Sequence, residues 1–537
     1  MEEGRKLRRE AGLIGLLFAS MGGIVGSGWL FGPLTAAQTA GPASIIAWMI
    51  GAVAVLLLSF VYAELTTAFP RGGAVVAFPK LSHGSLIALI MSWVVFLGYV
   101  TVAPAEVLGV MKYAHNYLPG IVTPDAASPL GFIEAAGLLA LFVVVNFFGI
   151  RWVLQLNTTL VWWKLLVPAL TAVMLIVVGG HFENLTSHGF SPMGTHGILS
   201  AVSTSGIVFS YLGFRQAIEL AGESSNPRRN LPIAVVGSVV IGAILYITLQ
   251  VALIAAIDPK DLAHGWAKLT FKGIAGPFAG LASLLGLGWL AAFLYIDSVI
   301  SPAGTGIIYT TTTSRVLFAI GNEGLMSKGL SALTERGVPV VALAITFLFG
   351  LVFLFPFPQW QTIVNYISSV TVLSYGIGPV VLLTLRKTLP IEGHPRPFLL
   401  KAAWPVAGLA FIISNLIIYW SGADTDNYVF GMILVFFVLF VAYEMFTKGS
   451  LAHLEWRGAW WLAPYFVGMW LLTRMGPKDL TGGSGLLPMG IDMVVVAVFS
   501  IVILMVAIAS GIPEPEEARA TILAGEPELL GPMPTRG

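Results

Sequence analysis

The sequence reads Gly22-Gly23-Ile24-Val25-Gly26-Ser27-Gly28 in the middle of an apolar stretch that covers residues 12–39. Each glycine inside a helix costs about 1 kcal/mol relative to alanine. Glycines at this density therefore predict that a helix crossing this stretch is unwound at its centre. The alternative interpretation is that the small residues form a surface for close helix packing.

The composition places this stretch in a membrane. Of 537 residues, 57% are hydrophobic and only 10% are charged, against about 25% charged in soluble proteins. So few charged side chains cannot cover the water-facing surface of a soluble protein of this size. The formal net charge of +1 and the absence of cysteine exclude a basic nucleic-acid binder, disulfides and cysteine chemistry. The sequence therefore predicts an all-α integral membrane protein without a nucleic-acid partner.

Apolar runs long enough to cross a bilayer recur along the chain. A membrane helix needs about 20 apolar residues, because the hydrocarbon core is roughly 30 Å thick. The short alternating segments of a β-barrel are absent from the sequence. Polar breaks between the runs predict about fourteen transmembrane helices. The predicted segments are 12–39, 43–68, 85–113, 130–149, 153–179, 197–222, 232–256, 288–314, 338–357, 361–386, 402–421, 428–447, 458–474 and 489–511.

Lysine and arginine residues predict which side each loop faces, because cytoplasmic loops carry an excess of them. Residues 1–10 contain four such residues and are therefore expected in the cytoplasm. Alternation from there places the other strongly basic loops and the acidic tail on the same side. We predict a multi-pass protein of the plasma membrane with both termini in the cytoplasm.

A second interrupted helix is expected within residues 197–222. Its sequence Phe209-Ser210-Tyr211-Leu212-Gly213-Phe214 is followed by Arg215 at membrane depth. Paired broken helices in the two halves of a transporter point to a binding site near the bilayer midplane. Half-helix N-termini face an anionic group there, and half-helix C-termini face a cation. A zwitterionic amino acid presents both charges and suits this geometry.

Four motifs resemble those of the amino acid–polyamine–organocation superfamily of transporters. The resemblance covers about the first 450 residues and is closest to proton-coupled symporters of aspartate and glutamate. It implies a LeuT-like fold of two inverted five-helix repeats that works by alternating access. The motifs are Gly26-Ser27-Gly28, the family's carboxylate loop; 62–65 with 69–73; 213–214 with 223–232; and 314–316 with 324–325.

The resemblance divides the chain into a transport core and additions at its C-terminal end, whose role the sequence does not indicate. The expected parts are a cytoplasmic N-terminus at 1–10, a ten-helix core at 11–390 with inverted repeats at 11–180 and 197–390, helices eleven and twelve at 400–447, two extra helices at 456–511 and a cytoplasmic acidic tail at 512–537.

Lys164 lies near the membrane centre in the fifth predicted helix, where a charge costs several kcal/mol. The resemblance implies that it occupies the place where sodium-coupled relatives bind sodium, so we predict a proton carrier. The alternative is a structural cation neutralised by carbonyl groups. Ser301, Pro302 and residues 304–306 indicate an irregularity in the eighth helix that could bind sodium instead. Because a lysine and a sodium ion repel each other, we favour protons.

Glu106 and Asp297 are predicted about seven or eight residues below the outer face. Burial in apolar surroundings favours the protonated form of a carboxyl group, so both are further candidates for proton coupling. The alternative, favoured for Asp297, is that they are hydrated in an outer vestibule.

Arg215 stands where similar permeases often have an acid. Its fork matches a carboxylate and predicts a substrate with an acidic side chain, unless it pairs with Glu219 one turn away.

The aromatic residues of the second interruption and of helix eight lie where the resemblance implies gating side chains, although aromatic residues in membrane helices more often serve packing or anchor a helix at the interface. Phe209 is the preferred gate. The predicted substrate-binding residues are Ile24, Gly26, Ser27, Gly28, Phe209, Tyr211, Gly213, Arg215 and Tyr309, and the predicted proton-coupling residues are Lys164, Glu106 and Asp297.

These residues predict a secondary transporter for proton-coupled uptake of an amino acid, with aspartate or glutamate favoured. The alternatives are a neutral amino acid permease, an amino acid exchanger or a nutrient sensor on the same fold. The histidines lack metal-ligand spacing, and neither a phosphate-binding loop nor a nucleophile elbow is present. We therefore expect no enzyme activity, metal or cofactor, and a monomer or homodimer.

Overall fold

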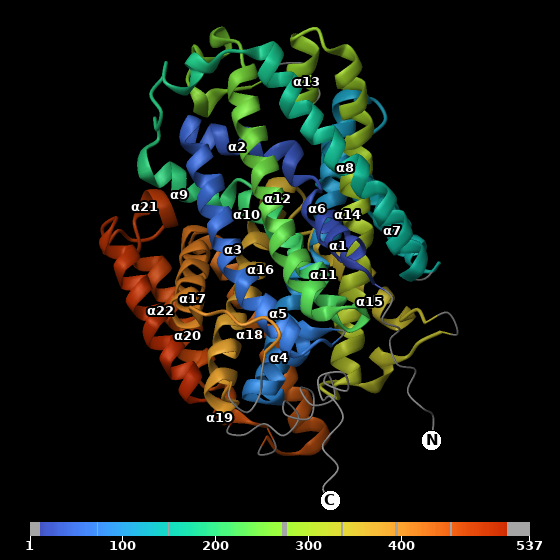
Figure 1. Cartoon of the computed structure of the whole chain (residues 1–537), viewed down its shortest axis with the longest axis vertical. Coiled ribbons are helices and arrows are strands. Elements are labelled where there is room, and N and C mark those ends of the chain that lie inside the picture. The colour runs from blue at the N-terminus through green and yellow to red at the C-terminus, as the bar shows by residue number, and fades with distance from the viewer. Residues whose placement is uncertain are drawn as a thin grey trace, which may run out of the picture.

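The structure is a computed structural model that describes residues 11–71, 73–148, 150–270, 276–334, 337–391, 396–451 and 454–512. Throughout these ranges the regular elements are helices (Figure 1), and the only β-type pairing is an isolated bridge between Ala11 and Ser224. The all-α prediction is confirmed. The acidic tail and the basic N-terminal residues lie outside the described residues.

The bounds of the helices follow the chain order. The α-helices are α1 Leu13–Ile24, α2 Gly28–Ala40, α3 Ser44–Ala68, α4 Ala74–His83, α5 Ser85–Val100, α6 Val102–Tyr117, α7 Pro129–Asn146, α8 Ile150–Gly179, α9 Gly194–Thr204, α10 Ile207–Tyr211, α11 Gln216–Glu219, α12 Pro227–Ala256, α13 Pro277–Leu284, α14 Gly288–Asn322, α15 Val340–Leu354, α16 Trp360–Thr388, α17 Ala403–Trp420, α18 Ala423–Lys448, α19 Trp456–Ala459, α20 Leu462–Met475, α21 Lys478–Thr481 and α22 Ile491–Ala509. Short 3₁₀ helices are η1 Gly41–Ala43, η2 Phe182–Leu185, η3 Leu212–Arg215, η4 Ala221–Glu223, η5 Pro259–Leu262, η6 Trp266–Lys268 and η7 Lys328–Ser331.

Many of these helices have the length and composition of membrane spans. In the described part of the chain, 10 helical stretches are long and apolar enough, or 11 if the bent pair around residue 205 counts as one span. This count treats Gly28–Ala68 as one stretch, and it leaves out the shorter apolar helices α1 and α15. The chain is thus a multi-pass membrane protein, while the number fourteen stays a prediction.

The first predicted segment is broken where the glycines predicted it. Helix α1 ends at Ile24 and α2 begins at Gly28, so residues 25–27 are not helical. The interpretation as an unwound stretch is confirmed. Close packing occurs here as well, because a Cβ atom on Gly213 would lie 2.1 Å from the backbone nitrogen of Ile24.

The second interruption lies a few residues before the predicted position. Helix α9 ends at Thr204, α10 begins at Ile207, and the two segments meet at a bend of 47°. Gly206 adopts a φ of +81°, which glycine reaches without the steric cost that a Cβ atom brings. Residues 209–214 instead continue as α10 and the 3₁₀ turn η3, so the prediction of the break at 209–214 is wrong in position.

The irregularity predicted in the eighth helix is wrong, because α14 is continuous from Gly288 to Asn322. Its glycines permit close approach of neighbouring side chains instead. A Cβ atom on Gly306 would lie 2.2 Å from the ring of Phe142, and one on Gly304 would lie 3.2 Å from the Lys164 ammonium. Here small residues mark packing and not unwinding.

Two ends of the helix bundle serve as reference points in Figure 1. We call the lower end, where α4 and α19 lie, the α4 end, and the upper end, where α13 lies, the α13 end. The C-terminal helices α20 and α22 stand at one side of the bundle, against α17 and α18. The short helix α21 between them contacts α9, the first part of the second broken helix.

Candidate substrate and ion site

The unwound loop between α1 and α2 is held by a carboxyl group of the chain itself. The backbone N–H of Ser27 donates to Glu106 Oε2 on α6 at 2.7 Å, and the indole of Trp360 donates to Ser27 Oγ at 2.8 Å. Ser27 and Glu106 are both fully buried. The other carboxyl oxygen, Glu106 Oε1, has no hydrogen-bond partner in the part of the chain that is described. The Ser27 N–H of the loop is thus occupied by Glu106.

Lys164 on α8 reaches the same break from the opposite side. Its ammonium donates to the carbonyl of Gly22 and to the hydroxyl of Thr305 on α14, both at 2.8 Å. The Thr305 hydroxyl also lies 2.8 Å from the Gly22 carbonyl and 3.1 Å from that of Val25. The cation therefore sits at the C-terminal end of α1, where the helix dipole is negative.

Asp297 on α14 is buried near this cluster. Ser301 donates to Asp297 Oδ1 at 2.7 Å, whereas Oδ2 has no partner among the described residues. The side chains of Trp29 and Trp163 lie beside the carboxyl group. Asp297 and Glu106 are both 0% exposed, so the prediction of a hydrated vestibule around them is wrong for this conformation.

Aromatic rings close the loop on its α13 side. The ring of Trp360 lies 4.8 Å from that of Phe31 and 6.3 Å from that of Phe209, centre to centre. A Cβ atom on Gly28 would lie 3.3 Å from the Phe209 ring. Phe209 thus stands against the loop.

Two predicted substrate-binding tyrosines point elsewhere. The hydroxyl of Tyr211 donates to the carbonyl of Trp48 at 3.4 Å, and its ring packs on Tyr246. It is Tyr246 on α12 that donates to the carbonyl of Ile24, at 2.7 Å. The ring of Tyr309 lies edge-on to Tyr99, toward the α4 end. The structure does not bring Tyr211 and Tyr309 to the loop.

Arg215 also lies apart from the loop. It ends η3 and its Nη1 donates to Ser374 Oγ on α16 at 2.7 Å. The pairing with Glu219 that the sequence left open does not form, since no ion pair within 4.0 Å joins these two described residues. Glu219 Oε1 instead accepts from the hydroxyl of Tyr99 at 3.4 Å.

Sequence reasoning missed several partners of the site. Trp360, Tyr246 and Ser374 contact the loop or Arg215 from helices to which no motif pointed. Thr305 was noted only as part of the expected irregularity. A polar residue within an otherwise apolar span is the signal that could have indicated Ser374, but Ser368 and Ser369 in α16 share it.

The site is closed in this conformation. Phe209 is 6% exposed and the other residues at the loop, Lys164 and Arg215 are exposed even less. A substrate can therefore enter only when helices move apart.

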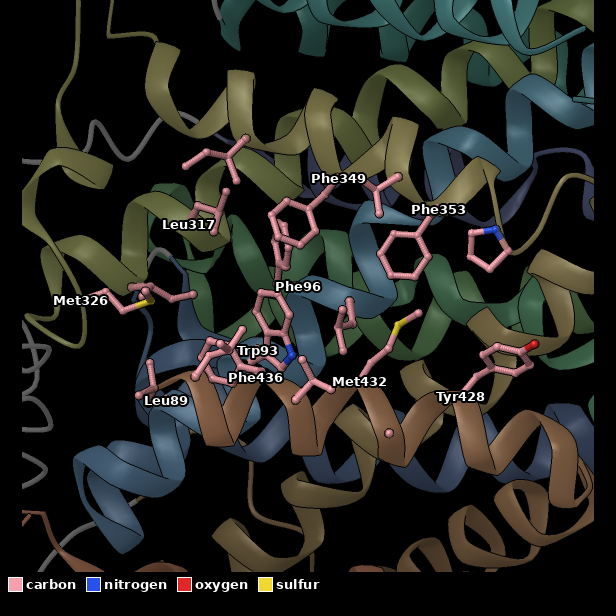
Figure 2. A pocket seen from close by; sticks show the side chains of 18 of the residues that line it. Leu89, Trp93, Phe96, Leu317, Met326, Phe349, Phe353, Tyr428, Met432 and Phe436 are labelled. Carbon is pink, nitrogen blue, oxygen red and sulfur yellow. The ribbon is translucent and has the colours of Figure 1, made fainter. Parts of the chain in front are cut away.

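The groove in Figure 2 is a different feature: it has a volume of about 620 Å³ and lies between α15 and α18. Apolar side chains such as Trp93, Phe349 and Phe436 line it.

Two broken helices that surround a buried ammonium group and buried carboxyl groups define a secondary transporter. The amino acid permease family matches residues 12–443, and the chain belongs to this family. It is 35% identical to the glutamate/serine transporter AimA of Bacillus subtilis, over 97% of this chain and 98% of that protein. It is 34% identical to the aspartate-proton symporter of the same organism, over 96% of this chain and 99% of that protein.

A third relative matches a smaller share of the chain. The branched-chain amino acid permease BcaP of Bacillus subtilis is 28% identical, over 77% of this chain and 89% of that protein. The two more similar relatives match nearly the whole chain, so they extend over the region of α20 and α22. The C-terminal addition is therefore shared with these two proteins.

Proposed function

We propose that the protein takes up an acidic amino acid, aspartate or glutamate, together with protons by alternating access. The observation that carries the proposal is the contact of the Lys164 ammonium with the end of the broken helix α1. An ionisable group at that point links its charge state to the position of the helix. The names of the two relatives similar over nearly the whole chain support an acidic substrate, and one of them supports protons.

Glu106 provides a direct link between substrate and proton. Its carboxyl group accepts the hydrogen bond from the Ser27 N–H, which is the donor that the α-carboxylate of a substrate would take. A substrate that binds there displaces Glu106. The displaced group, buried in apolar surroundings with one oxygen already unpartnered, is then more stable with a proton. Substrate and proton are thereby bound together.

Lys164 and Asp297 complete the proposed proton path. Protonated Lys164 holds α1 through the Gly22 carbonyl, and loss of its proton releases that end of the helix. Asp297 lies beside Trp29 at the start of α2, from where it can exchange protons with the opened α13 side. Binding of a sodium ion beside the Lys164 ammonium is less favourable, because the two cations would repel each other.

The remaining predicted residues are proposed to bind the substrate as it passes. The loop residues Ile24, Gly26, Ser27 and Gly28 offer backbone groups, and Phe209 covers them. The other predicted residues are Tyr211, Gly213, Arg215 and Tyr309, of which Arg215 is proposed to select acidic side chains.

We also propose the finer architecture that the family fold implies. It has fourteen spans, inverted repeats at 11–180 and 197–390, additional helices at 400–447 and 456–511, and both termini at the cytoplasmic α4 end. The corresponding positions of the two breaks, after α1 and after α9, support the inverted repeats. A monomer or a homodimer in the plasma membrane fits this arrangement.

Uptake of labelled amino acids into proteoliposomes tests the proposal. An inward proton gradient is expected to drive accumulation of aspartate or glutamate, and a sodium gradient alone is not. Uptake of serine or leucine without uptake of aspartate or glutamate identifies a neutral amino acid permease, and uptake that requires preloaded vesicles identifies an exchanger. A protein that binds these amino acids but transports none would be a sensor. Each of these three results would contradict proton-driven acidic uptake.

The variant Glu106→Gln tests the coupling step. Its side chain can still accept the Ser27 hydrogen bond but carries no titratable proton, so facilitated flux is expected to remain while proton-driven accumulation is lost. Thr310→Val is the matched control, because this buried hydroxyl only bonds back to a carbonyl of its own helix. Retained accumulation in Glu106→Gln would contradict the role of Glu106.

A further inference from the structure

A buried guanidinium group with two free donors lies inside the bundle. Arg215 is 0% exposed, and only its Nη1 has a partner, the hydroxyl of Ser374. Nε and Nη2 have no hydrogen-bond partner in the described residues. Because buried hydrogen-bond donors without an acceptor are costly, more so on a charged group, such an arrangement favours a binding partner that comes and goes.

Three tyrosine rings lie around this guanidinium. Its central carbon lies 4.4 Å from the ring centre of Tyr375, 5.5 Å from that of Tyr62 and 5.6 Å from that of Tyr99. Ring faces stabilise a cation but do not accept the in-plane N–H groups. The free Nε and Nη2 atoms form the side edge of the guanidinium.

The same edge of another arginine in this protein binds a carboxylate. Arg386 donates from Nε to Glu64 Oε1 at 2.9 Å and from Nη2 to Glu64 Oε2 at 2.5 Å. Paired hydrogen bonds of this kind are strong and specific for carboxylates. The free edge of Arg215 therefore fits a carboxylate, and Glu219 does not supply it because its carboxyl group faces Tyr99.

The position of Arg215 shows at which stage a substrate would reach it. On α16, Trp360 contacts Ser27 of the loop and Ser374 contacts Arg215. These two residues are fourteen positions apart, which corresponds to about 21 Å of helix rise. Even when long side chains shorten this span, the guanidinium lies on the order of 10 Å from the loop, toward the α4 end. Because this separation exceeds the distance between the two carboxyl groups of aspartate or glutamate, the loop and the guanidinium are separate contact points for a substrate.

We propose that Arg215 forms a second, inner binding site that takes the side-chain carboxylate of an acidic substrate after it leaves the loop. This inference rests on the proposed uptake of acidic amino acids and adds a step to it. Opening of the α4 end would separate Tyr62 and Tyr375 and expose the Nε and Nη2 edge. The inner site binds the substrate after it leaves the loop and then releases it to the cytoplasm.

Kinetics and binding of Arg215→Gln test the inner site. We expect the maximal rate of aspartate uptake to fall by at least about tenfold, since a bidentate charge-assisted pair is lost. The KM of uptake and the affinity of the purified protein for labelled aspartate should stay near the wild-type values, because the loop is intact. Unchanged binding also shows that the variant is folded.

Other outcomes overturn the inner site. A raised KM and weakened binding with an unchanged maximal rate would put Arg215 at the first site, and wild-type kinetics would remove it from the path. Should Arg215→Gln not fold, Arg215→Lys keeps the charge without the fork and must show the same reduced rate, whereas wild-type kinetics for it contradict the proposal. Absence of uptake by the wild-type protein would instead contradict the proposed function.

Discussion

Gly213 shows how a single residue joins the two broken helices. It packs against α1 so closely that a Cβ atom would lie 2.1 Å from the nitrogen of Ile24 and 2.2 Å from the carbonyl carbon of Gly23. Both are backbone atoms of the last turn of α1, so they cannot move without displacing the loop. The interaction therefore fixes the loop and the second broken helix relative to each other.

We expect Gly213→Ala to abolish uptake and to lower the thermal unfolding midpoint. Overpacking of this kind typically costs about 1–3 kcal/mol. Gly137→Ala is the control, because nothing lies within 4 Å of a Cβ atom there and alanine favours the helix α7. Uptake and unfolding in detergent measure both effects. Wild-type uptake by Gly213→Ala would show that this contact does not hold the loop.

At the residue scale, the sequence alone identifies charged side chains that lie unusually deep in the predicted membrane helices. Lys164 and Glu106 stand out because charges are rare inside membranes, and both lie at the loop. The partners of such groups are harder to predict. Trp360 meets Ser27 across 333 positions of sequence, and a tryptophan in a membrane helix has no local signal that separates a hydrogen-bond donor from a packing residue.

At the element scale, the C-terminal helices hold the turn between α4 and α5. The backbone N–H of Ser85 donates to Glu455 before α19 at 2.5 Å, and that of Ile512 after α22 donates to the carbonyl of Ser82 at 2.8 Å. Between them, the ring of His83 lies 3.0 Å from the carbonyl of Ala507 and 2.7 Å from the hydroxyl of Ser82. The C-terminal helices thus fasten the turn between α4 and α5.

His83 makes this attachment sensitive to pH. Burial lowers the pKa of His83 to about 4, against an ordinary value of about 6.5. The unfolded chain therefore binds this proton more readily than the folded protein. Stability contributed by neutral His83 is complete above about pH 6.5 and is lost as the pH falls toward 4. By pH 5.5 the loss is roughly 1 kcal/mol.

His83→Gln should flatten the dependence of stability on pH. The amide can still donate to the carbonyl of Ala507 but does not titrate. Thermal unfolding midpoints in detergent between pH 7.5 and 5 are the measurement, with His264→Gln as a control at an exposed histidine. The wild type and the control should lose stability over this interval and His83→Gln should lose less. Equal losses in all three proteins would exclude His83 as the source.

Helix boundaries followed from the sequence only where backbone chemistry decides them. The glycines of residues 22–28 predicted the first break correctly, because no side chain there favours helix. The second break was placed at 209–214 and occurs at 205–206, where one glycine with a positive φ decides. In α14 the glycines serve neighbours such as Phe142. A glycine can unwind its helix or allow a neighbouring helix to pack closely against it. Which of the two occurs depends on contacts with other segments, and the local sequence does not show them.

At the scale of the whole molecule, the last two helices are attached by polar contacts inside the bundle. Tyr465 on α20 donates to Asn415 on α17 at 2.8 Å, and Asn415 donates to Ser500 on α22 at 2.9 Å. Thr473 donates to the buried carboxyl group of Asp426 at 2.9 Å. Such contacts fix α20 and α22 to α17 and α18. No sequence motif predicts these contacts, because the family match ends at residue 443, before these helices.

The absence of cysteine from the chain allows the proposed topology to be tested with single introduced thiols. His264→Cys, Ala332→Cys and Leu486→Cys each place one at an exposed position in a different loop. In intact cells, a membrane-impermeant maleimide should label the variants at 264 and 486. The variant at 332 should react only after the membrane is permeabilised.

The pattern follows from the number of helices between the three loops. The loop at 332 and the loop at 486 are separated by α15, α16, α17, α18 and α20, an odd number of crossings, so they face opposite sides. Between 264 and 332 only α14 crosses, which puts 264 on the same side as 486. Protection of 486 together with 332 would mean that α20 does not cross the membrane, and the proposal of fourteen spans would fail. Labelling of 332 alone in intact cells would invert the orientation and place the basic loops outside, against the excess of lysine and arginine in cytoplasmic loops.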